Sequence, residues 1–542
     1  MLSVVVLIST LLFLFVQVPQ GAGLLLEVLR YASENVDKSL EQELRVIIEV
    51  SSLASRSSTI NSADLAGLAK HVCAARCNTT FNQTMANSKD SFERFWSLTE
   101  DPGLAIATRR SVLACIILHW ILQKERKFDD HAEKDLENIT RWFYNVHLHS
   151  VAQRGLLEYL HISKSGGTSF SEAAALNDCS MAPGIGQVEE LGDLPRWING
   201  TAFEEVTGGI DIMWSYYSTE GRSPKVRSCR ERSAYLHSLK YDYVSNEFTM
   251  HGGGTNMVET HVCPQTVNVV TLRDPDSRLI SHVHYILARI QKRLGKLKAS
   301  NDDDDDGEDD NGGEGFGGTV GGRGGSGEDI SQSEMFRSLF CQGNITMWEQ
   351  MAPTVVDNYI TRSFIGERAF HTSVGSIGLH HLDVARRVLL HFDLVLDMDA
   401  GSDATDFVLR QGLGWSVNMS QIHARSSWSV YSKLNYNASE CQNDGLLREL
   451  QARQGPDRQL YRFGRALAFL DFLHLVMAHK LGLQPVLDIS SFRRVASAGF
   501  YSRALSESGG GGGSGSGGGR VSGGGCGLIG AIQVKKRHLH KR

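Results

Sequence analysis

Two strand patterns, each followed at once by a charged turn and a helical pattern, constrain the fold of this chain most. Residues 156–162 form a mostly apolar run that leads through a glycine-containing turn into an expected helix at about 168–176. The apolar, β-branched run 267–272 leads in the same way into an expected helix at about 277–298. Strands that alternate with helices are typical of a parallel sheet covered by helices. The sequence therefore predicts an α/β fold with a central parallel sheet.

Weaker patterns extend this alternation along the chain. A further strand is expected at about 241–248, and helices are expected at 382–390 and 460–481. Residues 27–153 carry apolar residues at helical spacing, which predicts a mostly helical stem or accessory region before the α/β domain at 154–505.

Two segments are too polar and too rich in glycine to form a core. Residues 300–329 hold a run of eight acidic side chains followed by glycines, and we expect a disordered insertion there. Residues 506–542 form a glycine-rich flexible tail with a basic end. Without the eight acids the net charge of −6 becomes +2, so overall charge gives no support to a nucleic-acid partner.

The first 26 residues contain no charged side chain, and most of them are apolar. This pattern predicts a signal peptide or a signal anchor that would attach the chain to a membrane. Seven Asn-x-Ser/Thr sequons support entry into the secretory pathway. Their acceptors are Asn78, Asn82, Asn138, Asn199, Asn344, Asn418 and Asn437. We expect a glycosylated luminal protein, or a secreted one if the N-terminal segment is cleaved.

The chain has nine cysteines and no Cys-x-x-Cys pair, which disfavours a zinc ribbon. In an oxidising compartment some of them should form disulfides, although the sequence leaves the pairing open. The odd count leaves at least one over, and Cys526 in the glycine-rich tail is the natural candidate.

The turn after the first strand has the composition of an anion-binding loop. The free backbone N–H groups and partial positive charge of a helix N-terminus attract phosphate or sulfate. Gly166 and Gly167 allow close approach of an anion, Lys164 adds a positive charge, and Thr168 and Ser169 supply hydroxyls. A nucleoside-triphosphate P-loop places its lysine after the second glycine, unlike this segment. The plainer alternative is a tight turn with a capped helix.

The turn after the 267–272 strand carries a second anion-binding pattern. Arg273 ends the strand, and Ser281 follows eight residues later inside the next helix. A guanidinium and a hydroxyl so placed can converge on one phosphate. The alternative here is an ordinary Arg–Asp surface turn.

Together the two segments resemble the sulfotransferase family. Residues 161–168 resemble the His-Ile-x-Lys-Thr-Gly-Gly-Thr loop of the heparan-sulfate 6-O-sulfotransferases and related membrane-bound carbohydrate sulfotransferases, and residues 273–281 resemble the Arg-Asp-Pro-x-x-Arg-x-x-Ser motif. Weaker likenesses to heparan or chondroitin 2-O-type and algal or protist relatives lie at 357–362, 383–397 and 457–461. The resemblance covers about residues 156–483.

The resemblance implies a three-layer, P-loop-like sulfotransferase fold. It also implies a PAPS-dependent O-sulfotransferase of the Golgi membrane that transfers a sulfuryl group from 3′-phosphoadenosine 5′-phosphosulfate (PAPS) to a carbohydrate hydroxyl without a metal. The implied PAPS-binding residues are Lys164, Ser165, Gly166, Gly167, Thr168, Ser169, Arg273 and Ser281. Lys164 would also stabilise the leaving group as the S–O bond breaks.

The acceptor hydroxyl needs a general base, for which the family uses His or Glu. Glu247 and His251 are the candidates here, and His237 is a poorer third. No segment matches the His-Phe-Asp-Trp stretch of the 6-O enzymes, so the position sulfated stays open. Alternatives are a tyrosylprotein sulfotransferase and a non-catalytic glycan-binding protein with the same fold. A P-loop kinase is disfavoured by the missing Walker lysine.

Overall fold

The computed structural model describes most of the α/β region and part of what precedes it. The described residues are 25–56, 102–122, 130–207, 228–302, 341, 345–417, 419, 422, 431–432, 434, 436–438, 443–485 and 526. Nearly all of the expected signal segment, acidic insertion and glycine-rich tail lies outside them.

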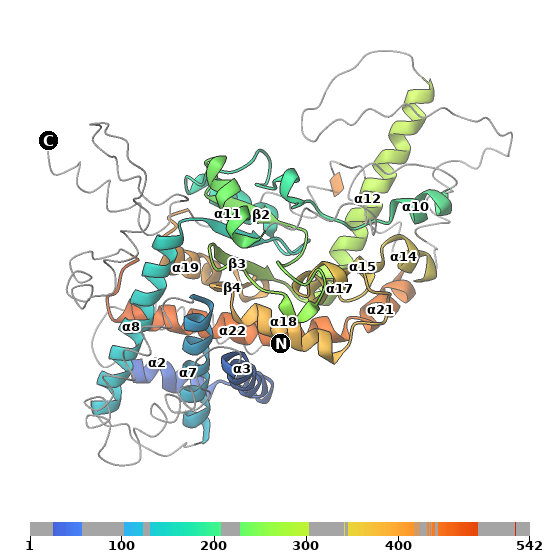
Figure 1. Ribbon diagram of the computed structural model, residues 1–542. Coiled ribbons are helices and arrows are strands. Elements are labelled where there is room, and N and C mark those ends of the chain that lie inside the picture. The colour runs from blue at the N-terminus through green and yellow to red at the C-terminus, as the bar shows by residue number, and fades with distance from the viewer. Residues whose placement is uncertain are drawn as a thin grey trace, which may run out of the picture.

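A sheet of four parallel strands forms the centre of the fold (Figure 1). Its strands are β1 (Leu157–Leu160), β2 (Tyr243–Asn246), β3 (Val267–Leu272) and β4 (Leu394–Asp397). Their order across the sheet is β2-β1-β3-β4, and every pairing is parallel. All four strands are buried. The predicted α/β class and its parallel sheet are confirmed for this part of the chain.

The order of the strands creates a switch point between β1 and β3. The chain leaves β1 toward β2 on one side of the sheet and leaves β3 toward β4 on the other. Leu160 is in register with both Asn246 and Val270, so the carboxyl ends of the strands meet at one edge. In open parallel sheets, ligands bind in the crevice outside the carboxyl ends at such a point. The loops after β1 and β3 therefore lie where a binding site is expected.

Helices cover both faces of the sheet. On one face Phe170 of α9 (Gly167–Leu176) stacks on Tyr159 of β1, with ring centroids 4.0 Å apart. On the other face α22 (Gly455–Lys480) approaches β3 so closely that a Cβ at Gly464 would lie 2.1 Å from Leu272 Cδ1. These contacts are on opposite faces because side chains alternate along a strand.

The remaining α-helices surround these layers (Figure 1). They are α2 (Leu25–Glu34), α3 (Lys38–Arg56), α7 (Pro102–Leu122), α8 (Asp130–Arg154), α10 (Gly200–Thr207), α11 (Cys229–Ser238), α12 (Pro275–Asp302), α14 (Ile345–Met351), α15 (Pro353–Val356), α16 (Tyr359–Phe364), α17 (Glu367–Phe370), α18 (Leu379–Leu390), α19 (Ser402–Leu413) and α21 (Asp444–Ala452).

The N-terminal helices share one hydrophobic core with the sheet layers. Asp471 of α22 is fully buried and accepts hydrogen bonds from Arg109 (2.6 Å) and Arg110 (2.9 and 2.5 Å) of α7. Arg154, at the end of α8, forms a paired contact with Asp393 just before β4. Buried ion pairs therefore join the N-terminal helices to the sheet layers, in addition to the hydrophobic contacts between them. Among the described residues, no helix combines the length and apolarity needed to cross a bilayer.

Two disulfides join pairs of described cysteines, Cys179–Cys526 and Cys229–Cys263, and Cys341 is also disulfide-bonded. The prediction that Cys526 is left over is therefore wrong. Cys526 is buried, its backbone N–H donates to Asp242 (2.8 Å), and its carbonyl accepts from Trp415 (3.1 Å). The glycine-rich sequence around Cys526 did not indicate these contacts. Disulfides persist in oxidising compartments, so the two bonds indicate an extracellular or secretory-pathway protein.

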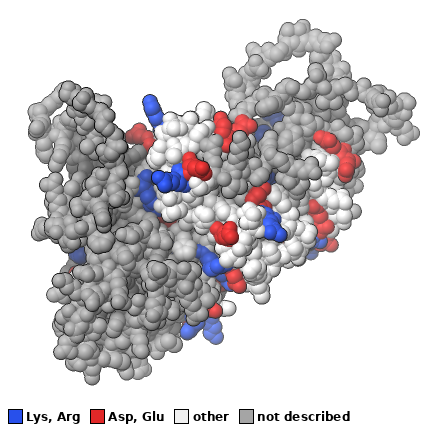
Figure 2. Space-filling model, in the orientation of Figure 1, with Lys and Arg blue, Asp and Glu red and all other residues white. Residues whose placement is uncertain are grey.

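Charges of both signs are interspersed over the described part of the face in Figure 2. Of the predicted glycosylation acceptors that are described, Asn138 and Asn437 are exposed and Asn199 is half-buried.

Candidate functional site

The loop after β1 wraps tightly and leaves the start of α9 uncapped. Lys164 and Gly166 both adopt left-handed backbone conformations, with φ of 69° and 84°. Gly166 is the N-cap residue, and no side chain caps the helix, whereas α11 and α21 are capped by Ser228 and Asn443. The first N–H groups of a helix have no partner within it. This end of α9 thus offers backbone donors and a positive dipole end to an anion.

Gly167 is required by close packing inside the loop. A Cβ at this position would lie 2.0 Å from Cδ2 and 2.5 Å from Cγ of the His161 ring. The imidazole of His161 is buried, and its Nδ1 lies 3.5 Å from Ser245 Oγ and 3.6 Å from Glu247 Oε2. Glycine at position 167 therefore lets His161 connect the loop to the end of β2.

The loops after β1 and β3 meet at the switch point. Arg273 Nη1 donates a hydrogen bond to the carbonyl oxygen of Lys164, at 3.0 Å. Lys164 Nζ lies 4.1 Å from the centre of the Tyr285 ring on α12. Ser281 lies four residues before Tyr285 and hence on the same face of that helix. The structure thus brings Lys164 and Arg273 together, with Ser281 on the helix face beside them.

The hydroxyl residues of the loop differ in how they are presented. Thr168 and Ser169 are half-buried in the first turn of α9. Ser165 is fully buried, its N–H donates to the Ile162 carbonyl at 3.1 Å, and its Oγ has no hydrogen-bond partner in the described structure. Ser281 is also largely buried, with an exposed fraction of 8%. Ser165 in this conformation does not face outward toward a ligand.

Glu247 lies at the centre of a buried hydrogen-bond cluster next to the loop. Ser163 Oγ donates to Glu247 Oε1, and Gln187 Nε2 donates to Oε2 at 2.9 Å. Trp197 Nε1 can only donate, and it donates to Ser163 Oγ at 2.8 Å. Since the single Ser163 proton is directed at Glu247, the Tyr359 hydroxyl, 2.9 Å away, donates to Ser163 as well. Both side-chain oxygens of Glu247 thus accept hydrogen bonds from neighbouring side chains.

The groups around this cluster have strongly perturbed proton affinities. Burial and the nearby Glu247 carboxylate raise the pKa of Tyr359 to about 12, so Tyr359 stays a protonated donor at neutral pH. Burial, Arg278 and Lys164 together hold the pKa of His282 well below its usual range. The His282 ring packs edge-on against Trp197 and Tyr359. It is therefore a neutral side chain in the wall of the site.

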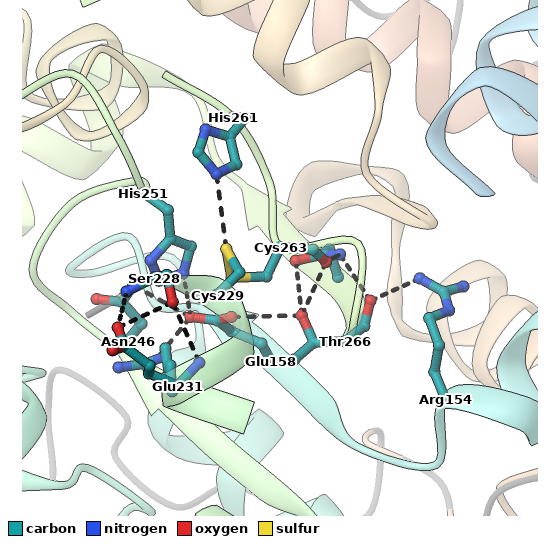
Figure 3. Close-up of a disulfide and its surroundings, with 12 residues drawn as sticks. Arg154, Glu158, Ser228, Cys229, Glu231, Asn246, His251, His261, Cys263 and Thr266 are labelled. Atoms are coloured by element: carbon teal, nitrogen blue, oxygen red, sulfur yellow. Dashed lines mark hydrogen bonds and ion pairs between the residues drawn. A yellow bond between two sulfur atoms is a disulfide. The ribbon is translucent and has the colours of Figure 1, made fainter. Parts of the chain in front are cut away.

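His251, the second candidate base, lies in a different cluster. Its Nε2 is 2.8 Å from Oε1 of Glu158 on β1, and Arg232 contacts the same carboxylate at 3.2 Å. Figure 3 shows His251 beside the Cys229–Cys263 disulfide. The structure thus separates the two candidate bases, with only Glu247 joined to the loop of Lys164. His237, the third candidate, is exposed near the end of α11.

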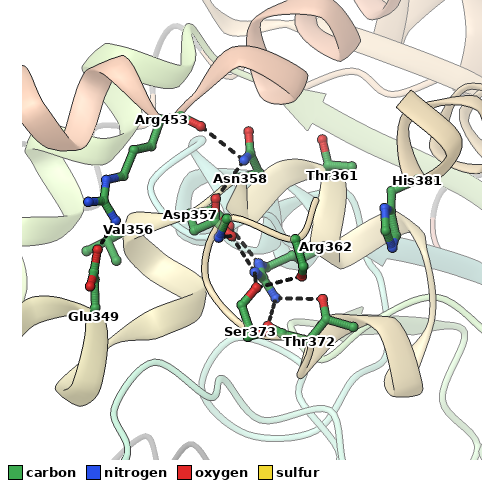
Figure 4. A network of polar contacts seen from close by, with 12 residues as sticks. Glu349, Val356, Asp357, Asn358, Thr361, Arg362, Thr372, Ser373, His381 and Arg453 are labelled. Carbon is green, nitrogen blue, oxygen red and sulfur yellow. Dashed lines mark hydrogen bonds and ion pairs between the residues drawn. The ribbon is translucent and has the colours of Figure 1, made fainter. Parts of the chain in front are cut away.

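The segment 357–362 forms a network of polar contacts that supports one side of the site (Figure 4). The buried Arg362 pairs with Asp357 and donates to the carbonyls of Phe370 (2.8 Å) and Thr372 (2.7 Å). Its guanidinium is directed at protein groups in this network, and this arrangement fixes the start of α16.

Asp457, in the last segment of the resemblance, accepts hydrogen bonds from the first turn of that helix. Its carboxylate accepts from the N–H groups of Ile360 (2.9 Å) and Thr361 (2.7 Å). The two segments together hold Tyr359 against Ser163.

Sequence reasoning missed several residues of this site. Ser163 stood inside the predicted loop, but its role depends on contacts from distant segments. Gln187 and Trp197 belong to no motif, and no sequence signal identified them, whereas the helical spacing of His282, His284 and Tyr285 after Ser281 did suggest that these three residues line the cleft. Comparisons of the chain with protein-family models, with curated proteins and with solved structures find no match.

Proposed function

We propose that this chain is a PAPS-dependent sulfotransferase that sulfates a hydroxyl group of a carbohydrate in the Golgi lumen, with a three-layer, P-loop-like sulfotransferase fold. The observation that carries the proposal is the contact between the two anion-binding loops, in which Arg273 Nη1 donates to the Lys164 carbonyl at 3.0 Å. One nucleotide with a phosphate group at each end can bridge loops that lie this close.

The two loops have complementary roles in holding the nucleotide. The uncapped start of α9 and the ammonium of Lys164 would bind the 5′-phosphosulfate. Arg273 and Ser281 would bind the 3′-phosphate. A guanidinium carries five N–H donors, so the bond from Arg273 to the Lys164 carbonyl leaves others for a phosphate. Gly166, Gly167, Thr168 and Ser169 complete the first turn.

The reaction would be an in-line displacement at sulfur. The acceptor oxygen forms the new bond to sulfur, the bond between sulfur and the 5′-phosphate oxygen breaks, and adenosine 3′,5′-bisphosphate leaves. Lys164 stabilises the charge that develops on the leaving oxygen. The proton of the acceptor hydroxyl passes to a general base.

Glu247 is the better supported base. Its carboxylate accepts a hydrogen bond from Ser163, which directly precedes Lys164 in the loop. Ser163 and Gln187 each donate a hydrogen bond to this carboxylate and so orient it beside the loop. The imidazole of His251 instead contacts Glu158, at 2.8 Å.

Radiolabelled PAPS tests the proposal directly. The full chain, secreted from eukaryotic cells, is incubated with labelled PAPS and with a panel of glycans and tyrosine peptides. We expect label on a glycan, and we expect Lys164→Ala and Arg273→Ala to abolish transfer while the protein stays folded. Lys292→Ala, an exposed lysine further along α12, is the matched control and should transfer normally. Label on tyrosine peptides alone would overturn the acceptor, and full activity in either loop variant would overturn the site.

The base assignment has its own test. Glu247→Gln keeps the size of the side chain and removes its basicity. We expect a loss of kcat of about 100-fold or more, with the affinity for adenosine 3′,5′-bisphosphate retained. His251→Gln is the comparison variant, and a larger loss of kcat there than in Glu247→Gln would transfer the role to His251.

A further inference from the structure

A second cluster of reactive side chains lies away from the Lys164 loop, between α11 and the connection from β2 to β3 (Figure 3). Cys229, His251 and Cys263 each offer a potential ligand atom, and these atoms all lie within 4.8 Å of one another. His261 lies at the edge of this group and outside that 4.8 Å set, with its Nε2 3.6 Å from Cys229 Sγ. Two sulfurs and two imidazoles are a common set of ligands for structural zinc.

The hydrogen bonds of the two histidines each occupy one ring nitrogen and leave the other nitrogen available to a metal. His261 Nδ1 lies 2.7 Å from the carbonyl oxygen of Glu259, which can only accept, so Nδ1 carries the proton and Nε2 keeps its lone pair. His251 Nε2 lies 2.8 Å from the Glu158 carboxylate and donates to it, so Nδ1 is the nitrogen of His251 that a metal could bind. Metal-binding histidines are oriented in this way by a carbonyl or carboxylate at the other ring nitrogen.

One separation between ligand atoms already fits a tetrahedral metal ion. With zinc–nitrogen and zinc–sulfur bonds of about 2.0 and 2.3 Å, a tetrahedral site separates a nitrogen from a sulfur by roughly 3.5 Å. The observed 3.6 Å between His261 Nε2 and Cys229 Sγ agrees with that separation.

We propose that Cys229, Cys263, His251 and His261 form a redox-gated zinc site, in which the Cys229–Cys263 disulfide is the oxidised state. A dithiol reductant transfers two electrons and two protons to the disulfide, giving two protein thiols and an oxidised dithiol. Zinc then displaces both thiol protons and binds two thiolates and two neutral imidazoles. In either state α11 stays joined to the connection that carries Glu247 at its start.

The site is accessible enough for this chemistry. His261 is exposed and His251 is half-buried, whereas Cys263 is fully buried. A reductant can therefore approach from the side of His261, and the buried sulfur gives the bound metal a protected ligand.

Cobalt(II) is the probe for the test, since thiolate-bound tetrahedral Co²⁺ has characteristic charge-transfer and visible d–d bands. The full chain is reduced with a phosphine under argon, freed of reductant and titrated with CoCl₂. We expect one equivalent with a two-thiolate tetrahedral spectrum in the reduced protein and none in the oxidised protein. Zn²⁺ should displace the Co²⁺ and bleach these bands.

Three variants assign the binding to this cluster. Cys179→Ser removes the Cys179–Cys526 disulfide and should keep the spectrum. Cys229→Ser/Cys263→Ser should lose it. His261→Ala keeps both cysteines and alters an exposed ring, so it should fold and should bind Co²⁺ about tenfold or more weakly.

The proposal is overturned if the reduced wild-type protein shows no tetrahedral Co²⁺ spectrum, in which case the disulfide is purely structural. It is equally overturned if His261→Ala binds Co²⁺ as tightly as the wild type. Neither result depends on sulfuryl transfer, so the zinc site and the proposed enzyme activity can fail independently.

Discussion

Substituting Gly167 by alanine tests the packing that builds the anion-binding loop. The new Cβ would lie 2.0 Å from Cδ2 and 2.5 Å from Cγ of His161, and Cγ is not the free end of a flexible chain. The ring must therefore move, and its contacts with Ser245 and Glu247 must change. Overpacking of this kind costs about 1–3 kcal/mol. Affinity for adenosine 3′,5′-bisphosphate should fall as well, because the start of α9 moves with the ring.

A double-mutant cycle isolates the clash. His161→Ala alone removes the ring, and Gly167→Ala added to that variant no longer meets its three nearest neighbours, which all belong to that ring. We expect the loss in free energy of unfolding in the double variant to be smaller, by roughly 1–2 kcal/mol, than the sum of the losses in the two single variants. Chemical denaturation followed by intrinsic fluorescence gives these free energies of unfolding. Gly455→Ala is the matched control, since Gly455 also begins a helix and its added Cβ has no neighbour within 4 Å.

Additive effects of Gly167→Ala and His161→Ala would refute this reasoning. They would mean that the glycine is not needed to accommodate the imidazole. A Gly455→Ala variant as unstable as Gly167→Ala would point instead to a general cost of alanine at the first position of a helix.

Three further predictions concern stability. Asp471→Asn should lower the free energy of unfolding by about 3–5 kcal/mol, because it leaves the buried guanidiniums of Arg109 and Arg110 without an anion. The control is Asp383→Asn, which removes an ion pair with Arg386 in which Asp383 is 66% exposed. It should change the free energy of unfolding by about 0.5 kcal/mol or less. Burial and Arg109 lower the pKa of His147 from 6.5 to about 4. Because the unfolded chain takes up this proton at a higher pH than the folded chain, the free energy of unfolding should fall by about 3 kcal/mol as the pH is lowered from about 6.5 to 4. His147→Gln should flatten this part of a plot of the free energy of unfolding against pH. Gly166→Ala should cost about 1–2 kcal/mol, because its φ of 84° is left-handed, and thermal unfolding will measure this loss.

Local patterns were sufficient to predict the framework of the fold. The strand at 267–272 coincides with β3, and the strand patterns at 156–162 and 241–248 contain the shorter β1 and β2. Helices expected at 168–176 and 460–481 correspond to α9 and α22. These elements have apolar periodicity and glycine turns that act within a few residues, which is why sequence alone could locate them.

What depends on distant contacts could not be predicted. Cys526 follows a run of glycines and looked unpaired, yet it is bonded to Cys179 through a disulfide and held by Asp242 and Trp415. The carboxylate of Glu247 could be chosen as a candidate from its place after a strand. Its orientation by Ser163 required three segments to meet in space, and no spacing rule encodes that.

A crystal structure with adenosine 3′,5′-bisphosphate bound tests the central claim most directly. The account predicts the 5′-phosphate at Lys164 and the first N–H groups of α9, and the 3′-phosphate at Arg273 and Ser281. It also predicts a Glu247 carboxylate within reach of the space beside the 5′-phosphate. A nucleotide bound elsewhere, or one that touches only one of the two loops, would contradict it.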